Sequence, residues 1–208
     1  DARIASAELQ ALHFPAAFPE VFLRDRPGFD CIVGNPPWEE ATVEKLGFWA
    51  QRFPGLKSQS QAVQQATIAL LEQERPDLVK QYERELEHAE RLRKALAAGP
   101  YPGMGTGDPD LYKAFAWRFW ELLREGGKAG VVLPRSALFA AGSAKWREAI
   151  FDRGGWEHIT TTLNRGGWMF DDAEHRYTVG LVVLGKDAQR STVTLAGPFT
   201  SLTDFVDH

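Results

Sequence analysis

An α/β fold is predicted by two kinds of pattern that follow each other along the chain. Short apolar runs bounded by Gly, Pro or Asn indicate buried strands, and they lie at 31–33, 128–133, 158–163 and 177–184. In the segments between them, apolar residues recur every three or four positions, which is typical of helices that bury one face. The chain has 208 residues, enough for one domain with a sizeable core.

Composition limits the classes of function. The formal charge of −4 is unfavourable for a DNA-binding protein, whose surface is usually basic, so either the charges are segregated or part of the DNA contact lies elsewhere. No run of 18 apolar residues and no leader is present, so we expect neither a membrane span nor a signal peptide. The single cysteine, Cys31, excludes an internal disulfide. We expect it to be buried, in a protein of the reducing cytoplasm.

The stretch from Phe29 to Trp38 organises the chain. Before it we expect a short strand near 11–14 and a turn near 18–22. Its apolar run ends at Gly34, Asn35 and two prolines, and proline has no N–H to continue a strand ladder. A residue before proline is also held extended. The sequence therefore predicts a stiff turn at the carboxyl end of a strand, which is where ligands bind in open α/β sheets.

This turn suits the recognition of a planar amine. The side-chain oxygen of Asn35 and the carbonyl of Pro36 can both accept hydrogen bonds from one –NH2 group, which would orient the nitrogen lone pair toward an electrophile. Trp38 can stack on the ring that carries the amine, a contact worth roughly 1–3 kcal/mol per base. A strand-ending turn with a packed tryptophan is the alternative interpretation.

Asn35-Pro36-Pro37-Trp38 resembles the Asn/Asp-Pro-Pro-aromatic motif of the S-adenosylmethionine-dependent DNA adenine-N6 methyltransferases. The preceding Phe-Asp-Cys-Ile-Val-Gly is similar to the lead-in of that motif. The segment before it resembles the large fused restriction–modification enzymes of this family. The resemblance implies a partial Rossmann-like methyltransferase fold, with Asn35, Pro36, Pro37 and Trp38 as catalytic residues and Asn35 also contacting the cofactor.

Residues 39–107 are expected to form a helical insertion. Apolar residues at helical spacing predict one helix over 58–71 and a second from about 78 to 96, and we expect the two to form a hairpin. The Gly- and Pro-rich stretch 101–110 lacks the Lys-Ser/Thr of a P-loop. It is therefore interpreted as a flexible loop that could close over a ligand.

A helix from Asp110 to Leu123 followed by a strand at 128–133 resembles the corresponding elements of the same methyltransferases. In that family, a tyrosine and a phenylalanine of this helix lie near the cofactor. The resemblance assigns these positions to Tyr112 and Phe115, whereas a plain helix core explains each of them equally well.

A helical region at 136–153 leads to two strands, 158–163 and 177–184, that resemble the final antiparallel hairpin of the family. The resemblance makes Phe170, in the loop between them, the residue that stacks on the flipped adenine opposite Trp38. Trp168 is a less suitable substitute, and a hydrophobic plug is the alternative for Phe170.

The same loop carries charged residues. His175 and Arg176 could meet a phosphate, and His175 with the nearby acidic residues Asp171, Asp172 and Glu174 could suggest a metal site. Exposed turn charges are the favoured interpretation, so we expect no metal.

The glycine-rich cofactor motif of the family is absent, and it would normally precede residue 1. We therefore interpret residues 1–186 as the C-terminal part of a methyltransferase domain and 187–208, with a weak strand at 192–195, as a linker or tail. The cofactor would be S-adenosylmethionine and the partners double-stranded DNA, the missing N-terminal cofactor-binding half and a target-recognition domain. Two alternatives stay open: a non-catalytic nucleic-acid-binding or assembly fragment, and a methyltransferase for another planar amine, in protein or RNA.

Overall fold

The computed structural model describes residues 12–104, 110–171, 174–187 and 192–207. The chain divides into two compact units: unit 1 contains 1–36 and 115–208, and unit 2 contains 37–114. Residues 1–11, 105–109, 172–173, 188–191 and 208 lie outside the described residues, and so do the parts of the predictions that fall on them, including Asp172.

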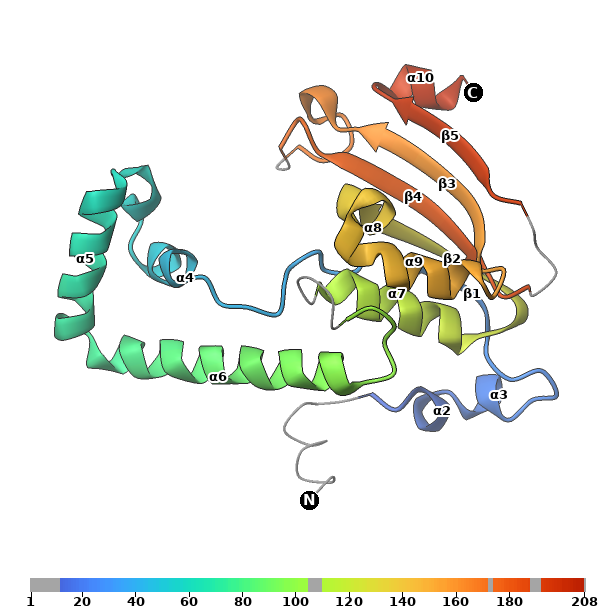
Figure 1. The fold of residues 1–208 in the computed structure, drawn as a ribbon, viewed down its shortest axis with the longest axis horizontal. Helices are drawn as coiled ribbons and strands as arrows, with labels where there is room; N and C mark the ends of the chain where they lie inside the picture. Colours follow the sequence, from blue (N-terminus) through green and yellow to red (C-terminus); the bar gives the residue numbers. More distant parts are fainter. Residues whose placement is uncertain (1–11, 105–109, 172–173, 188–191, 208) are drawn as a thin grey trace. The chain divides into compact units, whose positions relative to one another are not determined.

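Unit 1 is built on a five-stranded mixed sheet with the strand order β1-β2-β4-β3-β5 (Figure 1). The strands are β1 (Phe29–Gly34), β2 (Leu123–Pro134), β3 (Trp156–Leu163), β4 (Thr178–Gly185) and β5 (Thr194–Phe199). β1 and β2 are parallel, β4 is antiparallel to both β2 and β3, and β5 is parallel to β3. The parallel pair is connected through a helix, as in Rossmann-like folds, so the predicted α/β class is confirmed.

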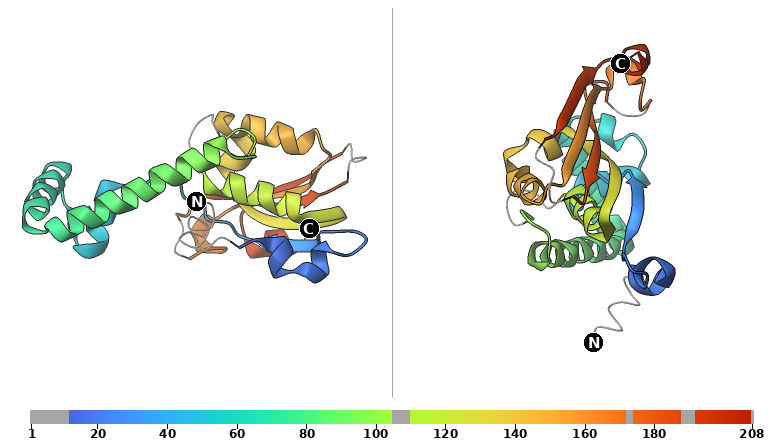
Figure 2. Two further views of the ribbon diagram at one scale, coloured as in Figure 1. Left: turned by 90° about the horizontal axis from the view of Figure 1, so that it is seen from below. Right: turned by 90° about the vertical axis from the view of Figure 1, so that its right-hand side faces the viewer.

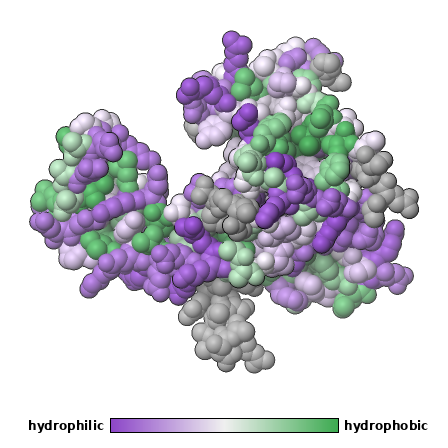
Figure 3. All heavy atoms as spheres, in the orientation of Figure 1, coloured by the Kyte–Doolittle hydropathy of each residue, from purple (hydrophilic) through white to green (hydrophobic). Residues whose placement is uncertain are grey.

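One face of this sheet is covered by α7 (Leu111–Leu122), α8 (Arg135–Phe139) and α9 (Ala144–Phe151) (Figure 2). Leu138 of α8 lies so close to the sheet that a Cβ at Gly180 would be 2.7 Å from its side chain. α9 reaches the start of β3, where the ring of Trp146 meets that of Trp156 edge-on, and the outer part of the sheet toward β5 is more open. Hydrophobic residues remain visible over the strands there (Figure 3), and Leu195 is 73% exposed.

The helical region expected over 136–153 consists of two helices. Ala140 has extended backbone angles, and a 3-10 turn, η2 (Ala141–Ser143), separates α8 from α9. The guanidinium of Arg147 in α9 donates hydrogen bonds to the carbonyls of Ala137 and Ala140 at 3.1 and 2.9 Å. The Ala137 carbonyl is one that the end of α8 leaves without a partner in the helix, whereas the Ala140 carbonyl also accepts the Ser143 N–H at 3.1 Å.

β1 lies at one edge of the sheet, which corrects the expectation that this strand is buried. Val33 is 83% exposed and Cys31 is exposed as well. Both alternate with Ile32 and Gly34, whose side of the strand faces α7. An apolar run alone cannot distinguish a central strand from an edge strand with one open face.

The segment before β1 is helical, so the expectation of a strand near 11–14 was wrong. It forms two short turns, α2 (Phe14–Ala17) and α3 (Pro19–Phe22), each with a proline in its first positions, where the missing N–H is not needed. The rings of Phe14, Phe18 and Phe22 surround that of Phe29, with centroids 6.2, 5.6 and 5.4 Å away. This aromatic cluster attaches the two turns to β1.

Unit 2 is helical and has its own core. Its elements are α4 (Lys45–Arg52), η1 (Leu56–Ser58), α5 (Gln61–Glu74) and α6 (Pro76–Ala98). Phe48, Trp49, Leu56 and Ile68 form one buried cluster, against which the first turns of α6 pack. The end of α6 packs in a second cluster with Ala41, Met104 and Ala114. Only Arg75 separates α5 from α6, and the helices form a corner where the pattern led us to expect a hairpin (Figure 1).

The last residues contribute to the sheet of unit 1. The strand expected at 192–195 is observed as β5, and α10 (Leu202–Val206) follows it. The Ser201 hydroxyl accepts a hydrogen bond from the backbone N–H of Asp204 and so caps α10. In the described part of the chain, no helix combines the length and apolar character needed to cross a membrane.

Candidate functional site

The Asn-Pro-Pro-Trp turn follows β1 directly, as the sequence predicts. Asn35 is exposed and Pro36 is buried at the end of unit 1, while Pro37 and the half-buried Trp38 open unit 2. The buried proline fixes the backbone, and the exposed amide leaves the Asn35 oxygen accessible to a ligand.

Within unit 1, the strand directions bring a second predicted residue to the same edge of the sheet. This edge is the side of the sheet at which the parallel strands have their carboxyl ends: β1, β2 and β3 all end there, and β4 begins there, with Leu163 opposite Thr178. The loop 164–177, which carries Phe170, therefore emerges on the same side as Asn35. β1 and β4 are separated by β2 alone, so the lateral distance between the two strands is roughly 10 Å.

Gly34 precedes Asn35 and lies under the ring of Phe119 from α7. A Cβ at this position would be 2.8 Å from Cε2 of Phe119, closer than real Cβ atoms come. Phe119 in turn contacts Phe115 edge-on, with ring centroids 6.1 Å apart, and Phe115 is 42% exposed. Glycine at position 34 thus permits the end of β1 to approach an aromatic surface that is open to a ligand.

The loop between β3 and β4 is organised by polar contacts. Its first turn, η3 (Arg165–Gly167), has left-handed backbone angles at Gly166 and Gly167 (φ 75° and 76°), which only glycine adopts readily. Trp168 donates a hydrogen bond from Nε1 to the Leu163 carbonyl at 2.8 Å, and its ring lies 6.2 Å from that of Phe205 in α10. Trp168 is therefore engaged inside the unit.

Phe170 is half-buried, and its ring stacks on no other described aromatic residue. Its backbone is held by Asn164, whose side chain bonds to both the N–H and the carbonyl of Phe170. Asn164 is 0% exposed. From the sequence alone, Asn164 is an ordinary loop residue. The only signal was a polar residue directly after a strand and before Gly-Gly, a pattern that many turns share.

The two aromatic residues assigned to the cofactor differ in accessibility. Phe115 is exposed in unit 1, whereas Tyr112 is 1% exposed within unit 2. Beside Tyr112, the buried Lys113 ammonium pairs with Asp110 at 3.0 Å. The pair keeps a buried charge compensated at the start of α7.

The charged side chains of the loop include an ion pair. Arg176 forms an ion pair with Glu174 on the surface of the loop. Across the described ranges, no cluster of three His, Cys, Asp or Glu side chains could hold a metal ion.

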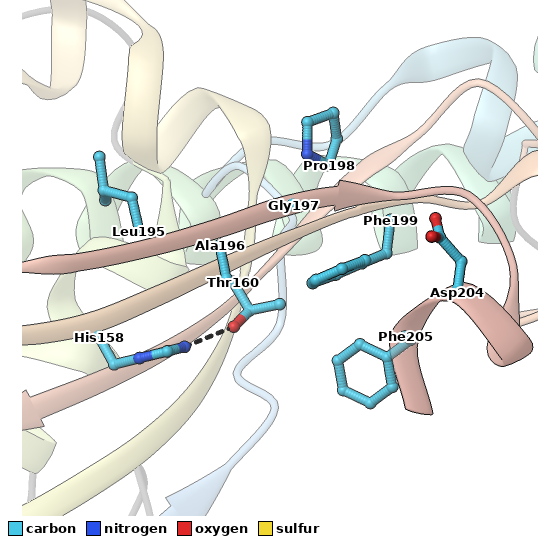
Figure 4. A pocket seen from close by; sticks show the side chains of 9 residues that line it. All are labelled: His158, Thr160, Leu195, Ala196, Gly197, Pro198, Phe199, Asp204 and Phe205. Atoms are coloured by element: carbon cyan, nitrogen blue, oxygen red, sulfur yellow. Dashed lines mark hydrogen bonds between the residues drawn. The ribbon is translucent and has the colours of Figure 1, made fainter. Parts of the chain in front are cut away.

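A pocket of about 590 Å³ lies elsewhere in unit 1, between β3, β5 and α10 (Figure 4). Its polar groups bond to neighbouring protein groups: His158 Nε2 lies 2.7 Å from Thr160 Oγ1, and Asp204 accepts the Thr200 N–H at 3.1 Å. None of the residues predicted for the site lines it.

No family model and no curated protein matches this chain. Three solved structures are similar to it in part. A Listeria monocytogenes protein assigned as a class I S-adenosylmethionine-dependent methyltransferase shares 17% identity over 44% of this chain and 28% of its own, with a TM-score of 0.36. The DrdV–DNA complex shares 14% identity over 86% of this chain and 16% of its own, with a TM-score of 0.46. The ATP-dependent type ISP restriction–modification enzyme LlaBIII bound to DNA shares 13% identity over 86% of this chain and 11% of its own, with a TM-score of 0.42.

The chain therefore spans less than a third of the length of each of these proteins. Because all three TM-scores are below 0.5, the assignment of a function depends on the chain's own residues.

Proposed function

We propose that this chain is the adenine-binding part of an S-adenosylmethionine-dependent DNA adenine-N6 methyltransferase. The enzyme would act on DNA in the cytoplasm as part of a restriction–modification or phage-defence system. Other segments would supply the cofactor-binding half and the target-recognition domain. The observation that carries the proposal is that the Asn35-Pro36 turn and the Phe170 loop emerge at one edge of the sheet.

The task of the chain's residues is to orient the target amine. In this proposal, the Asn35 side-chain oxygen and the Pro36 carbonyl accept its two N–H groups, which leaves the N6 lone pair free to attack. Trp38 and Phe170 stack on opposite faces of the adenine ring, which must be flipped out of the duplex to reach them. Because the amine can lose its proton after the attack, no strong base is needed.

S-adenosylmethionine would supply an electrophilic sulfonium methyl group. Asn35 is accessible to it, and the exposed ring of Phe115 offers an apolar surface beside Gly34. Tyr112, enclosed in unit 2, presents little ring surface to a ligand.

The first experiment measures S-adenosylmethionine binding by calorimetry, with this 208-residue chain and with a form extended at the N-terminus. We expect only the extended form to bind. Binding by the short chain would mean that its own residues build the cofactor site, and would overturn the half-domain proposal.

The second experiment measures methyl transfer from labelled S-adenosylmethionine to unmethylated duplex DNA by the extended form. We expect Asn35→Ala to slow transfer roughly 10²- to 10³-fold, the usual cost of one lost transition-state hydrogen bond. Trp38→Ala should lose roughly 1–3 kcal/mol of base binding. Gln73→Ala, which removes an exposed amide from α5, is the matched control. Full activity of Asn35→Ala would contradict the proposal.

A further inference from the structure

Asn164 holds the backbone of Phe170 at two points. Its side-chain oxygen accepts hydrogen bonds from the backbone N–H groups of Met169 and Phe170, both at 3.1 Å. Its Nδ2 donates to the Phe170 carbonyl at 2.9 Å. One amide thus bonds to the N–H and the C=O on either side of a single Cα, which restricts the backbone angles of Phe170 and the direction of its Cα–Cβ bond.

These three hydrogen bonds of the Asn164 side chain, called the clamp below, are anchored in the sheet. The backbone N–H of Asn164 donates to the Tyr177 carbonyl at 2.9 Å, directly beyond the last pair of β3 and β4, Leu163 and Thr178. Asn164 itself is fully buried. A regular strand end therefore determines the position of Phe170, although that residue lies six positions along an irregular loop.

Other contacts in the described part of the loop hold the neighbours of Phe170: Thr162 Oγ1 donates a hydrogen bond to Met169 Sδ at 2.8 Å. Arg165, Gly166 and Asp171 are exposed, and so is the segment 174–177. Trp168 is fixed separately, by its bond to Leu163 and its contact with Phe205. An apolar residue would suffice at position 164 if packing were its only role, because a buried amide is favourable only when its hydrogen bonds are satisfied.

We propose that Asn164 is the positioning residue that holds the Phe170 ring where it stacks on the target base. This inference rests on the function proposed above and adds to it the group that pre-organises one wall of the base site. Asn164 acts through Phe170 and does not touch the base. Its purpose is geometric: a stacking residue contributes fully only when its supporting groups fix its orientation.

The first arm of the test measures amide hydrogen exchange and needs no DNA or cofactor. In the wild-type chain, the amides of Met169 and Phe170 should exchange at least tenfold more slowly than they do in Asn164→Ala. Trp168→Phe keeps an aromatic ring near Phe205 and removes a different bond of the same loop, so it should leave both amides protected. Unprotected amides in the wild type would overturn the inference, whatever the enzyme does.

The second arm measures methyl transfer by the N-terminally extended form in a double-mutant cycle. If Asn164 acts through Phe170, then Asn164→Ala, Phe170→Ala and the double variant should lose activity to a similar extent, about tenfold or more. A general structural role predicts that the two losses multiply, and that result would overturn the inference.

A second variant covers the case in which Asn164→Ala does not fold. Asn164→Asp keeps an acceptor for both N–H groups but loses the donor to the Phe170 carbonyl. We expect amide protection to persist while methyl transfer falls, a split that a purely structural role would not produce; unchanged methyl transfer would contradict the inference. If the wild-type extended form transfers no methyl group at all, the proposed function fails, and the exchange arm alone decides whether the clamp exists.

Discussion

At the scale of single residues, Asp30 joins three segments of unit 1 by charge. Its carboxylate accepts hydrogen bonds from Arg124 at the start of β2 and from Arg24 before β1, the latter at 2.8 Å. The Arg124 bond, followed by that of Arg24, lowers the Asp30 pKa from 3.8 to about 2. Because the folded state binds this proton more weakly than the unfolded state, the carboxylate stabilises the fold above about pH 4, and the contribution disappears as the pH falls toward 2.

We therefore expect Asp30→Asn to lower the urea midpoint of unfolding at pH 7, with a difference from wild type that shrinks between pH 4 and pH 2. Asp25→Asn is the control, since Asp25 makes no ion pair with a described residue. A difference that stays constant down to pH 2 would show that the ion pairs are not its source.

Glycine at position 34 allows the backbone of β1 to lie close to the Phe119 ring. In Gly34→Ala, the new methyl group would meet the Phe119 ring at 2.8 Å, so either α7 or the end of β1 must shift. We expect a loss of about 1–3 kcal/mol in the free energy of unfolding, measured by denaturant titration, and partial recovery in the double variant with Phe119→Leu. Gly130→Ala is the matched control on the neighbouring strand, where the nearest atom would lie at 3.9 Å. Equal losses at both glycines would argue against the proposed clash.

At the scale of elements, the sequence predicts most strands and the long helices because their patterns are local. The runs at 128–133, 158–163 and 177–184 correspond to β2, β3 and β4, and the helix expected from about 78 to 96 corresponds to α6. The failures depend on information that local patterns lack. The position of β1 at the side of the sheet depends on which strands pair with it. The break between α8 and α9 depends on how the two helices pack against the sheet.

The candidate site likewise has a part that local sequence patterns predict and a part that they do not. Asn35 and its prolines are recognisable because a strand-ending Asn-Pro-Pro turn is a contiguous pattern. Its alignment with the Phe170 loop depends on the strand order, which no local pattern encodes. Asn164 could not be predicted, because its role arises from hydrogen bonds to residues five and six positions away in an irregular loop.

At the scale of the whole molecule, the two units have separate cores. Trp49 in unit 2 is 0% exposed among Phe48, Leu56 and Ile68, and its Nε1 has no hydrogen-bond partner among the described residues. Trp146 in unit 1 is also 0% exposed, and its ring meets that of Trp156 edge-on at 5.6 Å. These two buried tryptophans form a matched pair with which the independence of the units can be measured.

We expect Trp49→Ala and Trp146→Ala each to cost about 3–5 kcal/mol in the unit that contains the residue. Hydrogen exchange should show faster amides in α4, α5 and α6 for the first variant, and in β2, β3 and α9 for the second, because sub-global opening follows cooperative units. If Trp49→Ala accelerates exchange in the sheet as strongly as in the helices, the two units unfold as one. If the helical unit instead opens alone, the amides of the sheet unit, which contains Asn35 and Phe170, should keep their wild-type exchange rates.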